Sequence, residues 1–380
     1  MLSKPLSLAL VYVLTVANFL VLSLPFLMAI FPFMKVADEQ IIVNSQISFD
    51  PKMAFFLLVF LISSLMLFYL FIDFLFGLSV RSALQGCKRY DRLKNYHFLD
   101  EIFKQVQVKF AAKNTKLYIK NSDEINAFAI GGIGNKAIVL TKGLIEHYAK
   151  NTEDNQQFLL ALRSILGHEM SHLVNKDFLP GLIVIVNQKV TNFISGILML
   201  LFKIAIQTTT FFRVQNQRMA AIILSIYNIT DWILTFFNRH IVYNLYQFVR
   251  NFVSRSVEYR CDKQSAKAFG GMNMAFALSL LGKSGYFTLF STHPATQRRI
   301  HKVEVVEEKN AIIRASILTR ISNFIAILIL PCICLYAAHL ATLDDMVKIY
   351  LHNNHPQTYA DLIQIFATTK KSISDFIFPI

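Results

Sequence analysis

The sequence has few charged residues and few cysteines, and both shortages narrow the class of protein. Charged residues make up 16% of its 380 residues, whereas hydrophobic residues make up 54%, and the mean hydropathy is +0.45. Such a composition excludes an ordinary soluble protein. The four cysteines include no Cys-x-x-Cys pair, so the sequence indicates neither a disulfide framework nor a thiolate zinc site.

Acidic residues are also scarce: 24 stand against 38 basic ones, and the formal net charge is +14. That balance suits either a nucleic acid or a membrane surface. The chain has no zinc-finger, helix-turn-helix or RNA-binding signature, and basic residues gather beside apolar runs, as in RSALQGCKRYDRLK at 81–94. We therefore expect charge held on the cytosolic side of a membrane and no nucleic-acid partner.

Long apolar runs predict a polytopic α-helical membrane protein with about five transmembrane helices in contact with a lipid bilayer. The first run is too long for a signal-peptide core, so we expect it to be retained. The third contains Gln188 and Lys189, which leaves open whether it fully spans. Asp73, near the end of the second, is expected at the membrane interface. The runs are 6–33, 53–79, 180–202, 219–237 and 317–340.

Two polar stretches lie between these runs and form the candidate catalytic halves. They share one side of the membrane whether the third and fourth runs both cross or both do not, and the basic residues after the second run put that side in the cytosol. The expected parts are an N-terminal transmembrane hairpin at 1–80, a first peptidase half at 81–178, a second hairpin at 179–237, a second peptidase half at 238–316, and a C-terminal transmembrane helix and tail at 317–380.

The segment at 154–177, DNQQFLLALRSILGHEMSHLVNKD, is predicted to be a helix. Asp154 followed by Gln157 resembles a capping box. His168 and His172 point away from an apolar stripe, so one face can pack on a core while the histidines face a cleft. The stripe consists of Leu159, Leu162, Leu166, Met170 and Leu173.

Two histidines four residues apart lie one turn apart on one helix face, so both can bind one zinc ion. Glu169 points around the helix from them and is suited to take a proton from a water molecule that the metal has acidified. The pentad alone is a hypothesis, because a catalytic zinc also needs a third protein ligand. Two imidazoles and a carboxylate also suit iron or manganese.

The second polar half supplies candidates for that ligand. Glu258 and Asp262 share a helix face in SVEYRCDKQSAKAFGG, so Glu258 is predicted to complete the site. Asp262 is predicted to accept a hydrogen bond from the far nitrogen of a ligating histidine. The alternative is a solvated charged face. Farther on, STHPATQRRI places His293 at a helix start and Arg299 in the helix, where donors can stabilise an oxyanion; exposed basic residues are the alternative there.

Together these residues resemble the HtpX family of membrane zinc metallopeptidases, which is related to CAAX prenyl proteases and mitochondrial Oma-type proteases. The family pattern is HExxH, then ExxxD after a membrane hairpin, then THP-x4-R. It is matched by 168–172, by Glu258 with Asp262, and by Thr292–Pro294 with Arg299. The resemblance implies an α+β, mainly helical gluzincin-type domain with a small β-sheet.

The resemblance also implies a role for each matching residue. One Zn²⁺ per chain would be bound by His168, His172 and Glu258, with Glu169 as general base and Asp262 behind a ligand. His293 and Arg299 would assist at the transition state. Substrate would pair with an edge strand at NAFA, which comprises Asn126, Ala127, Phe128 and Ala129.

The expected protein is therefore a membrane zinc endopeptidase that degrades misfolded or damaged membrane proteins, in the inner membrane of a bacterium with its catalytic domain facing the cytosol. Two departures from the family pattern stand out: Cys261 replaces an alanine, and the run at 317–340 is additional. The alternatives are a CAAX-type processing protease, a transporter with a coincidental HExxH, and a non-catalytic adaptor. The sequence leaves substrate specificity and oligomeric state open.

Overall fold

The structure is a computed structural model, which describes residues 8–19, 51–132, 135–211, 243–281 and 294–341 together with scattered single positions elsewhere. It is mostly helical with one small mixed sheet, as predicted for the fold class. The chain divides into two compact units: Met1–Leu22 with Met66–Leu328, and Ser23–Leu65 with Ile329–Ile380. Both polar stretches of the sequence belong to the first unit.

The sheet has four strands in the order β1-β2-β4-β3. Strand β2 (Lys116–Lys120) pairs antiparallel with β1 (Cys87–Arg89) and parallel with β4 (Lys136–Thr141), and β4 pairs antiparallel with β3 (Ala127–Gly131). β4 is a continuous buried run because it lies between two strands and is covered by helices. β3 therefore lies at one edge of the sheet.

Helices pack around this sheet, and their bounds follow from local capping. Thr141 ends β4 and also caps α5 (Lys142–Asn151), where its side chain accepts a bond from the Leu144 amide. Asp154 caps α6 (Asn155–Asn175) by accepting a bond from the Gln157 amide at 2.7 Å, at the predicted helix start. The other elements of this region are α4 (Leu99–Lys109), α9 (Tyr243–Phe269), α10 (Gly271–Leu280), α11 (Thr296–Val303) and the 3₁₀ turns η2 (Tyr90–Arg92) and η3 (Lys94–Tyr96).

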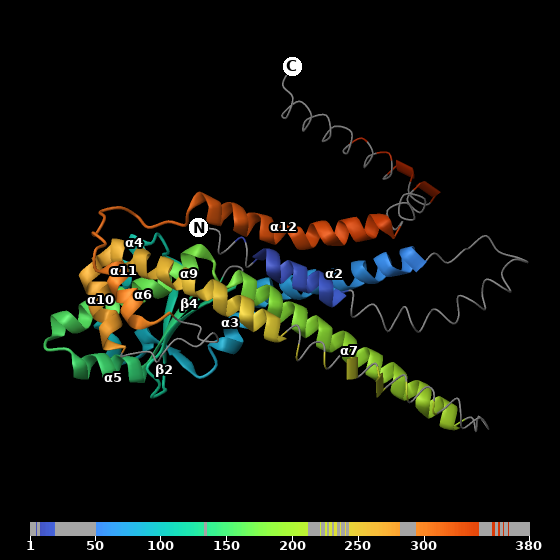
Figure 1. Cartoon of the computed structure of the whole chain (residues 1–380), viewed down its shortest axis with the longest axis horizontal. Helices are drawn as coiled ribbons and strands as arrows, with labels where there is room; N and C mark the ends of the chain where they lie inside the picture. The colour runs from blue at the N-terminus through green and yellow to red at the C-terminus, as the bar shows by residue number, and fades with distance from the viewer. Residues whose placement is uncertain are drawn as a thin grey trace, which may run out of the picture. The chain divides into compact units, whose positions relative to one another are not determined.

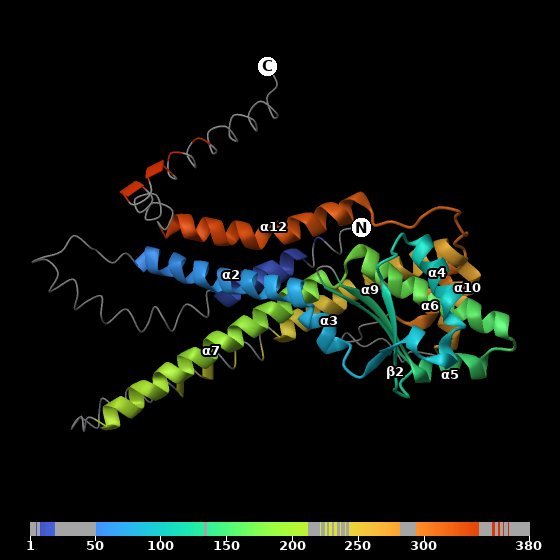
Figure 2. The same cartoon turned by 180° about the vertical axis from the view of Figure 1, so that it is seen from behind.

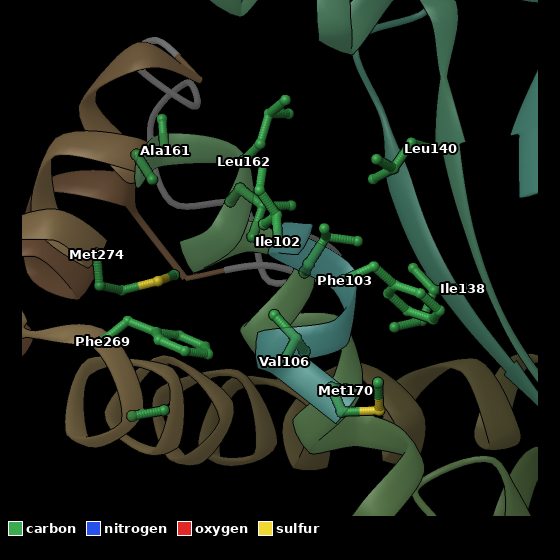
Figure 3. Close-up of a cluster of buried hydrophobic side chains, with 14 of the residues drawn as sticks. Ile102, Phe103, Val106, Ile138, Leu140, Ala161, Leu162, Met170, Phe269 and Met274 are labelled. Carbon is green, nitrogen blue, oxygen red and sulfur yellow. The ribbon is translucent and has the colours of Figure 1, made fainter. Parts of the chain in front are cut away.

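The core of this region forms where α4, β4, α6, α9 and α10 meet, and Figure 3 shows their apolar side chains pointing toward one another. The predicted stripe of α6 supplies much of it, since Leu162, Leu166, Met170 and Leu173 are at most 1% exposed. This packing fixes α6 along its length, including the turns that carry the histidines. In Figures 1 and 2 these helices gather around the strands, while α7 (Leu179–Phe211) extends away from them.

Among the residues that the structure describes, two helices are long and apolar enough to cross a membrane: α2 (Pro51–Phe76) and α12 (Ile317–Leu340), within which the segments Phe55–Phe76 and Ile317–Leu340 qualify. They correspond to the second and fifth predicted runs. Shorter apolar helices at Leu8–Phe19 and in α7 match parts of the first and third. Most of the fourth run lies outside the described residues, so the prediction of five spans is not confirmed.

Several polar side chains on these helices are buried while large apolar ones are exposed, which is common where helices face lipid. In α7, Phe193 is 57% exposed, whereas Asn187 and Thr191 are buried and accept hydrogen bonds from Asn18 at 3.0 and 2.6 Å. Asp73 is likewise buried. It accepts bonds from the Ser79 amide and hydroxyl at 2.6 and 2.9 Å, which holds the corner between α2 and α3 (Leu78–Ala83).

Candidate metal centre and active site

Three predicted ligands come together where α6 packs against α9. His168 and His172 lie one turn apart on α6, and their Nε2 atoms are 3.2 Å apart. The carboxylate of Glu258, from α9, places Oε2 at 3.5 Å from His168 Nε2 and Oε1 at 3.5 Å from His172 Nε2. The three donors therefore converge on one point.

These separations fit a single metal ion. Tetrahedral zinc with bonds of about 2.0–2.1 Å requires donors roughly 3.3 Å apart, and the observed values are 3.2–3.5 Å. The donor types also fit, because two imidazoles and a carboxylate are a ligand set that zinc takes in catalytic sites. The cluster is thus a candidate metal site formed by residues of α6 and α9.

Each histidine is oriented by a carboxylate on its far nitrogen. His168 Nδ1 lies 2.8 Å from Asp262 Oδ1, and His172 Nδ1 lies 3.1 Å from Asp177 Oδ2. A proton on Nδ1 that is donated to a carboxylate leaves the Nε2 lone pair free for a metal. The structure thus places Asp262 against a histidine, as the sequence predicts, and adds Asp177.

Asp177 has no counterpart in the sequence-based prediction. It follows α6 directly after Lys176, a residue in the left-handed conformation (φ 55°), which turns the chain back toward His172. The Arg260 guanidinium, from α9, donates to the same Asp177 oxygen that faces His172. An acidic residue just past the helix end was the available signal, but only the reversed chain direction brings it near His172.

Arg299 lies on α11 and is 8% exposed. Its Nε and Nη2 atoms each donate to a different oxygen of Asp262 at 2.7 Å, and Nη2 also lies 3.3 Å from Glu258 Oε2. This bidentate pair fixes Asp262 and neutralises part of the charge of two carboxylates. The resemblance implies a role for Arg299 at the transition state, which stays a prediction; the structure places its guanidinium against Asp262 and Glu258.

The electrostatics of the cluster favour positive charge. Burial lowers the pKa of His168, but hydrogen bonds to Asp262 and Glu258 raise it to about 10. The pKa of His172 is also raised, against the effect of burial, by Cys261, Asp177 and Glu258. Burial raises the pKa of Asp262, but the hydrogen bonds from Arg299 and His168 bring it below its usual value. Protons and a metal cation therefore compete for the same donors.

The remaining predicted site residues differ in what the structure says of them. Glu169 is 8% exposed and close enough for its charge to act on Arg299. Ala127, Phe128 and Ala129 form part of β3, which packs against α6, and the Asn126 amide donates to Thr141 Oγ1 at 3.0 Å. His293 lies outside the described residues.

The chain is similar to several known proteins. The profile described as "Peptidase family M48" matches residues 94–307, more than half of the chain. The "Protease HtpX homolog" of Aquifex aeolicus is 25% identical over 54% of this chain and 70% of its own length, and that of Sulfurihydrogenibium sp. is 26% identical over 64% and 85%. "Protease HtpX" of Legionella pneumophila is 28% identical over 28% and 34%.

Among solved structures, the crystal structure of Ste24p from S. mikatae is similar at 16% identity with a TM-score of 0.37. The similarity covers 77% of this chain and 66% of that one, which is less than two thirds of its length. A likeness at this TM-score is too weak to support an argument about fold. The matched family region spans every described member of the cluster, from His168 to Arg299.

Proposed function

The chain belongs to peptidase family M48, and from this premise we propose that it is a membrane-bound zinc endopeptidase with one metal ion per chain. The observation that carries the proposal is the convergence of His168 Nε2, His172 Nε2 and the Glu258 carboxylate within reach of one ion. Membership in a peptidase family also weighs against a transporter with a coincidental motif.

The chain's own residues divide the chemistry between them. Zinc, when bound, polarises a substrate carbonyl and lowers the pKa of a water molecule to about 7. Glu169 accepts the proton of the attacking water and passes it to the leaving amine. Asp262 and Asp177 keep the lone pairs of His168 and His172 directed inward. Arg299 holds Asp262 and Glu258 in place, and we assign His293 to stabilising the oxyanion.

The substrate is proposed to be an extended polypeptide that pairs with β3. An edge strand offers unpaired backbone groups, so a peptide can add to the sheet as a further strand. β3 has only β4 as a partner among the described strands, and it packs against the helix that carries Glu169. Binding through the backbone tolerates many sequences, which suits a protease that removes misfolded membrane proteins.

The cellular setting is proposed on the distribution of charge. Basic residues follow α2 closely, and such residues favour the cytosolic face. They are Arg81, Lys88, Arg89, Arg92 and Lys94. We therefore place the protein in a bacterial inner membrane with its metal centre on the cytosolic side.

The proposal is tested with the full-length protein in detergent and its Glu169→Gln variant. The expected result is about one zinc per chain in both proteins, with casein cleaved by the wild type alone. Glu146→Gln is a matched control, because Glu146 is a half-exposed glutamate of α5 that pairs with Lys142 at 3.3 Å. A wild type without metal, or equal cleavage by the wild type and Glu169→Gln, would overturn the proposal.

A further inference from the structure

Helix α12 is the segment that the sequence pattern left without a role. Its exposed face is apolar, with Ile321, Phe324 and Ile325 each at least 50% exposed. Its buried face is instead polar or small over the first turns, where Asn323 is 4% exposed and Ala326 is 3% exposed. A buried amide in a helix of this kind requires a hydrogen-bond partner, because an unpaired one costs several kcal/mol in hydrocarbon. The partner of Asn323 therefore shows which element the buried face of α12 contacts.

The partner is the last residue of the helix that carries both histidines. The final carbonyl groups of any helix lack partners within the helix. At the end of α6, the His172 carbonyl accepts from the Asp177 amide at 3.0 Å, and the Leu173 carbonyl accepts from the Lys176 amide at 3.2 Å. The Asn175 carbonyl accepts from Asn323 Nδ2 at 3.1 Å. Helix α12 therefore supplies a cap that α6 does not make for itself.

The same residue connects the two ligand-bearing helices. Asn175 is fully buried, and its Nδ2 donates to the Ser171 carbonyl and to Gln264 Oε1, both at 2.7 Å. Gln264 lies on α9, the helix that carries Glu258, and the Ser171 hydroxyl donates to the same Gln264 oxygen. A displacement of Asn175 would thus move the end of α6 relative to α9, and with it His172 relative to Glu258.

Helix α12 is itself held near this contact. The Tyr12 hydroxyl, from the helix Leu8–Phe19, donates to the Ala326 carbonyl about one turn beyond Asn323. Asn323 therefore lies on a backbone that is bonded from a second side. This makes the amide a fixed donor rather than a side chain on a loosely attached helix.

We propose that α12 is a positioning element of the metal centre, which acts through Asn323 on the C-terminal end of α6 and so on His172. This inference rests on the proposed function, because it assumes that His172 binds the metal. Loss of outer partners of metal ligands typically weakens metal binding 10- to 100-fold. Asn323 acts through the backbone end of α6 and not through a hydrogen bond to a ligand's own partner, so we expect a loss of roughly ten-fold, at the lower end of that range.

The experiment measures zinc affinity by competition with a chelator, using the full-length protein in detergent. Asn323→Leu removes the donor at similar volume, and Asn323→Ala removes it without steric conflict if the larger side chain prevents folding. Ser322→Ala is the matched control: Ser322 is buried on the same helix at 8% exposure, and its hydroxyl donates to the Leu318 carbonyl of its own helix. Hydrogen exchange at 171–177 provides a second readout that does not require the metal.

The expected result is roughly ten-fold weaker zinc binding and faster exchange at 171–177 in both Asn323 variants, with Ser322→Ala unchanged. Zinc affinity equal to that of the wild type in the Asn323 variants would overturn the inference and leave the proposed function intact. An equal loss in Ser322→Ala would also overturn it, because the effect would then be general destabilisation of α12. A wild type that binds no zinc would overturn the proposed function itself.

Discussion

The substitution Asp262→Asn is the sharpest test of how the metal centre is organised. Asp262 is fully buried and has two partners: the His168 ring through Oδ1 at 2.8 Å, and the Arg299 guanidinium through both oxygens at 2.7 Å. The asparagine keeps the shape of the side chain but removes its charge. Its amide group can also donate to His168 Nδ1, which favours the tautomer that carries its proton on Nε2.

We expect a loss of zinc affinity and a larger loss of folding stability. The wrong tautomer removes the lone pair that faces the metal, and loss of such a partner weakens metal binding by about 10- to 100-fold, or roughly 1.4–2.7 kcal/mol. The substitution also removes the carboxylate that pairs in a bidentate manner with the buried Arg299. Removing one partner of a buried ion pair costs about 3–5 kcal/mol of folding stability. Zinc affinity and thermal stability should therefore both fall, and the fall in stability should persist in the metal-free protein.

The assay is chelator competition for zinc affinity, together with thermal unfolding with and without metal. The control is Asp100→Asn, because Asp100 forms an Asp–His pair with His97 at 3.4 Å in which both side chains are more than half exposed. Pairs of that kind contribute about 0–1 kcal/mol, so neither readout should change. Zinc affinity within two-fold of the wild type in Asp262→Asn would refute the reasoning that Asp262 sets the tautomer of His168.

Three further outcomes are expected. Lys176→Gly should raise the melting temperature. Lys176 has a left-handed backbone conformation (φ 55°), which is about 1 kcal/mol less favourable for a residue with a side chain than for glycine. A lower melting temperature would show that the Lys176 side chain itself is needed. Gly167→Ala should lower both folding stability and zinc affinity, because the added Cβ would lie 2.7 Å from Ser265 Oγ and 2.8 Å from the Phe269 ring. This contact would force α6 and α9 apart at a cost of about 1–3 kcal/mol. Zinc titration and thermal unfolding test this prediction, and unchanged values would contradict it. In the metal-free protein, the pKa of His168 is raised from 6.5 to about 10, so its protonation stabilises the fold fully below pH 6.5 and less as the pH rises through 10. Unfolding curves should therefore show greater stability at pH 6 than at pH 10. The opposite order would show that another group dominates.

The sequence predicts the candidate metal ligands better than the residues that surround them. His168 and His172 were predicted as ligands from their spacing on one helix, and Glu258 from a second helix and the family resemblance; the structure brings the three together. Asp177 was not predictable from that spacing, since it lies past the end of α6 and reaches His172 only through the left-handed turn at Lys176. Arg299 was predicted near the site, but its bidentate contact with Asp262 depends on how α11 meets α9.

For the apolar helices, prediction from sequence is limited in a different way. Hydropathy locates apolar runs, and α2 and α12 coincide with two of them. Hydropathy does not say which buried polar side chains join those helices. The contacts of Asn18 with α7 and of Asn323 with α6 arise from tertiary packing between residues far apart in the sequence. Asp73 is expected at the interface from its place in the run, and hydropathy does not predict that it accepts hydrogen bonds at the corner between α2 and α3.

In the sequence, α7 lies between the two helices that carry the candidate metal ligands, α6 and α9. His172 and Glu258 enclose a loop on the order of 90 residues, so a metal bound to both is a reversible cross-link between distant segments. Because the unfolded chain has no preformed site, the free energy of binding the metal would add to the free energy of unfolding. With zinc bound as proposed, removal of the metal would lower the stability of the fold as well as the activity.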